Sequence, residues 1–170
     1  MTAPTAPVTV LLKTSLGDIT LELDTEKAPE TVANFVEYVK DGHFDGLTFH
    51  RVIKGFMIQG GGYEVEGYQQ RATRAPIKNE CQNGLKNLRG TIAMARTNDP
   101  HSATSQFFIN HVDNAFLDGR AGQWGYAVFG RVTAGLDVVD TIAGVETGRI
   151  RPFGQDVPVT TVVIEKASLA

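Results

Sequence analysis

The chain has 170 residues, of which 42% are hydrophobic and 21% are charged, a composition typical of one ordinary globular domain. Its 16 Lys and Arg residues against 19 Asp and Glu residues give a net charge of −3. This argues against a nucleic-acid partner and a polybasic membrane anchor, because both need a basic excess. The one cysteine, Cys81, excludes an intrachain disulfide and is expected to be an ordinary thiol in a reducing compartment.

The ends of the chain carry no recognisable targeting feature. The first seven residues, MTAPTAP, contain neither the basic nor the apolar segment of a secretory signal. No apolar run reaches the roughly 20 residues that span a bilayer, so we expect no membrane partner and a cytoplasmic location. We predict a disordered N-terminal tail over residues 1–7, a single domain over residues 8–166, and a C-terminal tail over residues 167–170.

The first part of the domain predicts a β-hairpin followed by a helix. Residues 8–14 and 18–23 are joined by a short turn that contains Gly17, and apolar and polar residues alternate in the second run, as in a half-buried strand. A helix is predicted to begin at Pro29 and to end near Lys40, because a proline suits the first turn and a cation suits the last. Its apolar residues fall on one face: Val32, Phe35, Val36 and Val39.

The remainder of the chain predicts a second helix and six short strands. The helix is expected over residues 136–142, and the strands over residues 48–53, 56–60, 91–95, 106–110, 127–132 and 159–166. Eight short strands with glycine-rich turns and two helices predict a mainly β fold, either a closed antiparallel barrel or a sandwich. Because side chains fill the interior of an eight-stranded barrel, a functional site would lie on its outer wall.

Common signatures of nucleophilic and metal chemistry are absent from the sequence, which contains no Gly-x-Ser-x-Gly, His-Glu-x-x-His or Cys-x-x-Cys. Residues 55–60 have the glycine spacing of a phosphate-binding loop, but residues 61–63 lack the Lys and the Ser or Thr that would hold phosphate and magnesium. The histidines are not spaced as metal ligands: His43, His50, His101 and His111. We therefore predict no cofactor and no metal.

Two segments combine apolar strands with unexpected polar residues. Residues 49–61 (FHRVIKGFMIQGG) place Arg51 in the middle of an apolar strand, shortly before an aromatic residue, a thioether and an amide. In residues 105–110 (SQFFIN), strand alternation puts Gln106 and Phe108 on one face and their apolar neighbours on the other. The residues alone leave two interpretations open: ordinary surface and packing positions, or a groove that binds peptides.

These segments resemble the cyclophilins, the cyclosporin-binding peptidyl-prolyl cis-trans isomerases, and most closely the bacterial branch. The resemblance extends over roughly residues 8–166, and other matching stretches follow in the expected order: residues 29–35, 90–95 and 128–130. It implies a closed eight-stranded antiparallel β-barrel capped by two α-helices. It also implies an isomerase without cofactors, which acts on proline-containing peptides and unfolded protein clients and assists protein folding.

The resemblance also implies roles for individual residues. Arg51 matches the catalytic arginine of the family, and Gln59 is suited to orienting it or to contacting the substrate. The segment that binds the substrate backbone is matched by Ala95, Arg96 and Thr97. The rim of the proline pocket is matched by Gln59 and Gln106, and its walls by Phe56, Met57, Phe108 and Leu117.

Several positions depart from the eukaryotic pattern of the family. Phe116 stands where those members carry a tryptophan that bonds cyclosporin, Tyr126 stands where they carry a histidine, and Arg96 replaces an asparagine. Residues 118–126 also form a longer stretch, and they contain Trp124. Phe116 and Tyr126 remain candidates for substrate contact. We expect an intact isomerase site that binds cyclosporin weakly.

The preferred hypothesis is a monomeric prolyl isomerase that acts on flexible or unfolded polypeptides. The alternative is a binding module that recognises proline-containing segments through the same pocket without useful catalysis. Acceleration of cis–trans exchange by sub-stoichiometric protein discriminates the two. A hydrolase that uses His50 or His101 is a third interpretation, although neither histidine lies in a nucleophile arrangement in the sequence.

Overall fold

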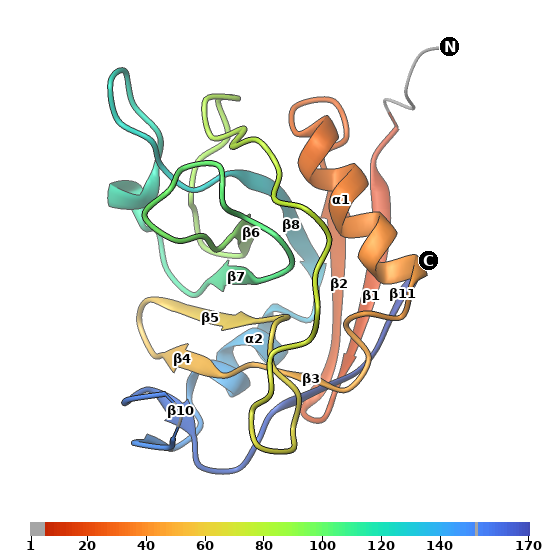
Figure 1. Ribbon diagram of the computed structural model, residues 1–170, viewed down its shortest axis with the longest axis vertical. Helices are drawn as coiled ribbons and strands as arrows, with labels where there is room; N and C mark the ends of the chain where they lie inside the picture. The colour runs from red at the N-terminus through yellow and green to blue at the C-terminus, as the bar shows by residue number, and fades with distance from the viewer. Residues whose placement is uncertain (1–5, 152) are drawn as a thin grey trace.

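A curled antiparallel sheet forms the body of the molecule in the computed structural model, which describes residues 6–151 and 153–170 (Figure 1). Nine strands form this sheet, in the order β3-β11-β1-β2-β8-β6-β7-β5-β4. No helix within the described ranges is long and apolar enough to cross a membrane. The tail predicted over residues 1–7 falls mostly outside those ranges.

The predicted hairpin is confirmed and lies inside the sheet, between β11 and β8. It consists of β1 (Val8–Thr14) and β2 (Gly17–Leu23). Gly17 has a φ of +134°, and a Cβ there would lie 2.8 Å from the Val138 side chain, so the end of the turn requires a glycine. Alternate side chains of the hairpin are completely buried in the core: Val10, Leu12, Ile19, Leu21 and Leu23.

The helix α1 (Pro29–Lys40) also forms where the sequence predicts it. Its apolar face enters an aromatic core, in which the Phe35 ring centroid lies 4.8 Å from that of Phe44 and 5.6 Å from that of Phe107. At the positive end of the helix, a Glu80 carboxylate oxygen accepts hydrogen bonds from the Thr31 N–H at 2.7 Å and its hydroxyl at 2.6 Å. A distant loop is thereby attached to the start of α1.

Shorter elements complete the fold. A one-turn 3-10 helix (Ala115–Leu117) follows the seventh strand, and the helix α2 (Leu136–Ala143) follows the eighth. A separate two-stranded sheet, which the sequence did not predict, is formed by β9 (Thr147–Gly148) and β10 (Val157–Pro158). The other strands of the main sheet are β3 (Leu47–Thr48), β4 (Arg51–Ile53), β5 (Met57–Gly60), β6 (Thr91–Met94), β7 (Phe107–Asn110), β8 (Val128–Ala134) and β11 (Val163–Leu169).

The mainly β class and the two helices are confirmed, but the prediction of a closed eight-stranded barrel is wrong because the sheet is open. The single strand predicted over residues 48–53 is divided into β3 and β4, which form the two edges of the sheet. Isolated hydrogen bonds, rather than a ladder, join this segment to residues 156–162. A regular ladder is prevented there because Asp156 has a φ of +71° and Pro158 has no N–H.

The C-terminal strand differs from the prediction as well. β11 begins only at Val163, but it continues to Leu169. Ala167, which is 4% exposed, lies opposite Leu12 of β1. Residues 167–169 therefore belong to the sheet and not to a tail, because pairing with a central strand outweighs their weak intrinsic strand preference.

Opposite faces of the sheet carry two separate apolar clusters. Phe107 and Ile109 belong to the interior cluster, whereas Phe108 points to the other face, as strand alternation predicts. The smaller cluster on that face, which we call the outer cluster, contains Met57, Ala93, Phe108, Leu117 and Val128. The outer cluster provides a buried apolar floor on the outside of the sheet.

Candidate active site

A small cavity of about 130 Å³ lies over the outer cluster. The hairpin of β4 and β5 supplies four of its lining residues, and segments distant in the sequence supply the others. The complete lining is Arg51, Phe56, Met57, Gln59, Ala95, Arg96, Phe108, Leu117 and Tyr126. All nine are residues that the family resemblance singled out.

The Arg51 guanidinium is the exposed cation of this cavity. Arg51 lies opposite Gln59 in the register of the hairpin, so both side chains project from the same face. Arg51 Nη1 donates a hydrogen bond to Gln59 Oε1 at 3.5 Å, and Gln59 Nε2 donates to Gln106 Oε1 at 3.1 Å. Because a guanidinium has five N–H donors, Arg51 retains donors for a ligand.

Apolar side chains form the walls of the cavity. Met57 is 2% exposed and Phe108 is 4% exposed. The Tyr126 ring meets Phe108 edge to face, with 5.6 Å between the ring centroids. Phe56 stacks on Phe116 at 5.7 Å. A small apolar notch with a cation beside it suits a compact ring attached to a polar backbone.

Three residues implied by the resemblance do not line the cavity itself. Gln106 lies behind the lining residue Gln59 and accepts a hydrogen bond from it. Phe116 is 64% exposed and extends the wall outward from Phe56. Thr97 bonds within its own loop, where its N–H and hydroxyl donate to the Ser102 hydroxyl oxygen at 2.9 and 2.8 Å.

Arg96 holds the loop beside the cavity. Its guanidinium lies 4.6 Å from the Tyr126 ring centroid. It also donates to three backbone carbonyls, those of Gly125 (3.1 Å), Thr97 (2.8 Å) and Trp124 (3.3 Å). The sequence interpretation gave this segment a role in binding the substrate backbone, and it missed the contacts of the side chain with residues 124–126.

The three consecutive glycines at positions 60–62 provide room for side chains around the site. Gly61 has a φ of +90°, and a Cβ there would lie 2.9 Å from the Phe107 ring. A Cβ at Gly62 would lie 2.6 Å from Gln106 Cγ. The glycine run is visible in the sequence, but the side chains that it accommodates are known only from the fold.

A group of buried asparagines behind the site was missed by the sequence interpretation. Asn114 Nδ2 donates to the Phe56 carbonyl at 2.9 Å and to Asn110 Oδ1 at 2.8 Å. Asn110 Nδ2 in turn donates to Asn87 Oδ1 at 3.1 Å. All three asparagines are at most 3% exposed. Their sequence context does not distinguish them from ordinary turn residues.

The positions of His50 and His101 do not favour the hydrolase interpretation. His50 is buried against the rings of Tyr63 and Phe153, with centroid distances of 4.6 and 4.9 Å. Burial, together with the positive charge of Arg51, lowers the pKa of His50 to about 4. His101 Nδ1 accepts a backbone N–H at 3.1 Å. Neither histidine lines the cavity.

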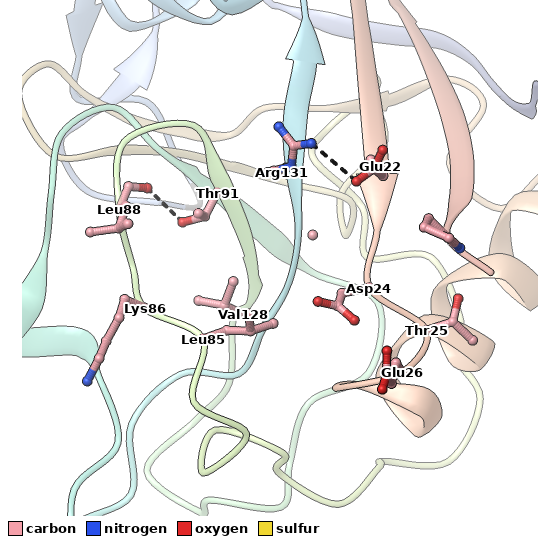
Figure 2. Close-up of a pocket in the computed structure, with 12 residues that line it drawn as sticks. Glu22, Asp24, Thr25, Glu26, Leu85, Lys86, Leu88, Thr91, Val128 and Arg131 are labelled. Carbon is pink, nitrogen blue, oxygen red and sulfur yellow. Dashed lines mark hydrogen bonds and ion pairs between the residues drawn. The ribbon is translucent and has the colours of Figure 1, made fainter. Parts of the chain in front are cut away.

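A second and larger cavity, of about 360 Å³, lies beside β2 and β8 (Figure 2). Carboxylates of Glu22 and Asp24 lie on one side of it, and the side chains of Leu85 and Val128 lie on the other. The guanidinium of Arg131 is paired with Glu22 at 3.3 Å. This cavity therefore has room for a ligand, but its guanidinium is already engaged by a carboxylate.

Two bacterial proteins are similar to almost the whole chain. A peptidyl-prolyl cis-trans isomerase of Streptomyces antibioticus is 61% identical over 164 residues, which cover 95% of this chain and 98% of that protein. Peptidyl-prolyl cis-trans isomerase B of Escherichia coli (strain K12) is 56% identical over 164 residues, with coverage of 95% and 99%.

A crystal structure is similar in fold. It is a cyclophilin type peptidyl-prolyl cis-trans isomerase of Cryptosporidium parvum, in the presence of the dipeptide Ala-Pro, with a TM-score of 0.79 and 25% sequence identity. The match covers 95% of this chain and 98% of that chain. The family model "Cyclophilin type peptidyl-prolyl cis-trans isomerase/CLD" matches residues 9–169. The chain therefore belongs to the cyclophilin family of enzymes, the peptidyl-prolyl cis-trans isomerases.

Proposed function

We propose that Arg51 catalyses rotation about X–Pro bonds by binding the twisted form of the bond while the apolar cavity holds the proline ring. The observation that carries this proposal is the exposed Arg51 guanidinium beside the notch that the buried side chains of Met57 and Phe108 form. In this proposal Arg51 is the catalytic residue and Gln59 assists it.

The chemistry of the bond explains why a cation is useful. A peptide bond resists rotation by about 18–20 kcal/mol, because the nitrogen shares its lone pair with the carbonyl group. At the twisted midpoint this conjugation is lost, and the proline nitrogen carries a localised lone pair. An N–H donor that binds this state better than either planar state lowers the barrier. The rotation requires no nucleophile.

Arg51 has the properties that this role demands. Its guanidinium is charged at every relevant pH and carries several donors. The contact of 3.5 Å with Gln59 restricts the directions in which it can point. A rate gain of about 10⁴ requires about 5.5 kcal/mol. A charged hydrogen bond in a partly dry pocket, together with orientation of the substrate, is of sufficient size to supply this energy.

We propose flexible and unfolded polypeptides as the substrates. X–Pro exchange takes tens to hundreds of seconds without a catalyst, which is slow enough to limit protein folding. The cavity lies on the outer wall of the sheet, where an extended segment can reach it. In the described residues, the exposed large apolar side chains lie in separate segments of the chain. We propose that the protein is a monomer and that it assists folding in the cytoplasm.

Weak binding of cyclosporin is a further part of the proposal. Phe116 is exposed at the rim and stacks on Phe56. Its side chain has no N–H group, so it cannot donate the hydrogen bond that an indole at this position would supply. Phe116 is proposed to contact substrates only through its ring.

NMR exchange measurements on an Ala-Pro-Phe-type peptide test the proposal. We expect sub-stoichiometric wild-type protein to accelerate cis–trans exchange, and Arg51→Ala to lower kcat/KM by about a hundredfold or more, which is about 2.7 kcal/mol. Arg131→Ala serves as the control, because Arg131 lies at the larger cavity. Unchanged turnover by folded Arg51→Ala would remove Arg51 from the mechanism. Peptide binding without acceleration would support the binding-module interpretation.

A further inference from the structure

The turn between β4 and β5 is held from behind by a histidine. Gly55 lies in this turn with a φ of +77°, and its N–H donates to His111 Nδ1 at 2.9 Å. The backbone N–H of His111 donates to the Phe56 carbonyl at 2.9 Å. The His111 side chain is 15% exposed. The residue that follows β7 is thus connected to two of the three residues in the turn of this hairpin, residues 54–56.

The other side of the His111 ring contacts α2. His111 Nε2 lies 3.0 Å from Asp140 Oδ1. Arg89 binds both oxygens of Asp140, at 2.8 and 2.9 Å, and it donates to the His111 carbonyl at 2.8 Å. Hydrogen bonding to Arg89 holds the pKa of the Asp140 carboxyl below its ordinary value. A charged carboxylate thereby favours the tautomer of His111 that carries its proton on Nε2.

We propose that His111 is a positioning residue of the isomerase, and that its neutral Nε2–H tautomer fixes the turn that carries Phe56 into the pocket. This inference rests on the proposed function of the Arg51 site. The turn joins the strands of Arg51 and Gln59, so a displaced turn alters the pocket wall and the hairpin together. The His111 ring accepts its hydrogen bond from Gly55, which does not line the cavity, so the ring acts on the pocket through the turn.

This arrangement makes the site sensitive to protons. A second proton on His111 would occupy Nδ1, which could then no longer accept the Gly55 N–H. The charged groups around the ring are Asp140 and Arg89, together with Lys54 on the turn and Asp113 on the loop that follows His111. Isomerase activity should therefore fall under conditions that place a proton on Nδ1 of His111.

Two substitutions separate the roles of the ring nitrogens. In His111→Asn the amide oxygen can take the place of Nδ1 and accept the Gly55 N–H, but it cannot be protonated near neutral pH. In His111→Leu the volume is largely kept and the acceptor is lost. We expect His111→Leu to lower kcat/KM by about fivefold to tenfold at about pH 8, the change that one ordinary hydrogen bond supports. His111→Asn should stay within about twofold of the wild type.

The pH profile and the Gly55 amide resonance provide the decisive readouts. On acidification, wild-type kcat/KM should fall, and the Gly55 amide resonance should shift together with the resonances of the His111 ring. The His111→Asn profile should be flat. His50 does not account for a fall near neutral pH, because burial lowers its pKa to about 4.

Different results would overturn different statements. A flat profile of an active wild-type enzyme, or wild-type activity of folded His111→Leu, would overturn the role of His111 and leave the Arg51 proposal intact. A Gly55 resonance that does not follow the His111 ring would also overturn the inference. A wild-type protein that fails to accelerate exchange at about pH 8 would overturn the proposed function, and the role of His111 with it.

Discussion

The smaller cavity, at Arg51, and the larger cavity, at Arg131, differ in how their arginines are paired. At the smaller cavity, Arg51 is exposed and contacts a neutral amide at 3.5 Å. At the larger cavity, Arg131 is paired with Glu22. Ligand sites are commonly sought in large pockets, but the smaller cavity has the features that the proposed reaction requires. The larger cavity is lined by the exposed Lys86 as well as by Arg131, so neither volume nor charge alone distinguishes the two. The smaller cavity is distinguished because all its lining residues are ones that the family resemblance singled out.

The two cavities are also related, because they share part of one apolar cluster. Val128 belongs to the outer cluster with Met57 and Phe108, and Leu85 packs against that cluster. Both Val128 and Leu85 line the larger cavity. Substitutions on the two sides of this shared wall therefore provide matched pairs for testing which cavity performs the chemistry.

The largest expected effect is the loss of stability in acid that burial of His50, beside the smaller cavity, causes. His50 lies next to Arg51, and its folded-state pKa of about 4 is below the unfolded value of 6.5. Above about pH 6.5 both states are neutral, whereas at lower pH only the unfolded chain takes up the proton. The free energy of unfolding should therefore fall by up to about 3 kcal/mol between about pH 6.5 and pH 4.

Urea unfolding of the wild type and of His50→Gln over this pH range measures the effect. Over this range the free energy of unfolding should decrease by about 3 kcal/mol less in His50→Gln than in the wild type, because glutamine does not titrate. As a control on the other side of the shared wall, Glu22→Gln should leave the His50 contribution in place. Equal pH dependence of the wild type and His50→Gln would contradict the prediction.

Truncation of the pocket wall should have the next largest effect. Phe108→Ala removes a ring that is 4% exposed, and kcat/KM should fall by about thirtyfold, or about 2 kcal/mol, because the apolar contact with the proline ring is lost. Leu88→Ala, in the larger cavity, should change kcat/KM by less than about twofold. The peptide assay is made after circular dichroism shows that each variant is folded. Equal losses in the two variants would contradict the assignment of the smaller cavity.

Exchange of arginine for lysine should have a smaller effect. Arg51→Lys keeps the positive charge but loses the planar fork of donors, so kcat/KM should fall by about tenfold. Arg131→Lys makes the same change at the larger cavity and should have wild-type activity. Full activity of Arg51→Lys would mean that charge alone, without the geometry of the guanidinium, is sufficient.

The smallest expected effect concerns cyclosporin. Phe116→Trp places an indole N–H donor at the rim of the smaller cavity, and the dissociation constant should decrease by about fivefold, the gain expected from one hydrogen bond. Titration calorimetry of the two proteins measures this change. Leu88→Trp at the larger cavity is the control and should have no effect. An unchanged dissociation constant in Phe116→Trp would indicate that another feature, such as the longer stretch over residues 118–126, controls affinity.

Local patterns in the sequence predict the parts of the fold that depend on neighbours in the chain. The hairpin over residues 8–23 and the helix that begins at Pro29 follow from periodicity and turn residues. The alternation around Phe108 correctly separates the interior of the sheet from its outer wall. The residues that line the smaller cavity were predicted from the family resemblance, because the unusual pattern around Arg51 and Phe108 was also compatible with ordinary surface and packing positions.

Features that depend on distant contacts were not predicted. The edges of the sheet are determined by Asp156 and Pro158, which lie about a hundred residues from the strands whose pairing they interrupt. The contact between His111 and Gly55 joins two loops, and the role of Arg96 depends on carbonyl groups of residues 124 and 125. Hydrogen bonds of this kind have no periodic signal, so only the assembled fold reveals them.

The tight space at Gly62 has a consequence for engineering. Any side chain there would meet Gln106 from behind, at 2.6 Å for Cγ and 2.8 Å for Nε2, and Gln106 accepts the hydrogen bond from Gln59. An alanine at this position must displace the Gln106 side chain, and the hydrogen bonds through Gln59 transmit that displacement to Arg51. Position 62, which does not line the cavity, therefore offers a way to change the rim of the site from behind.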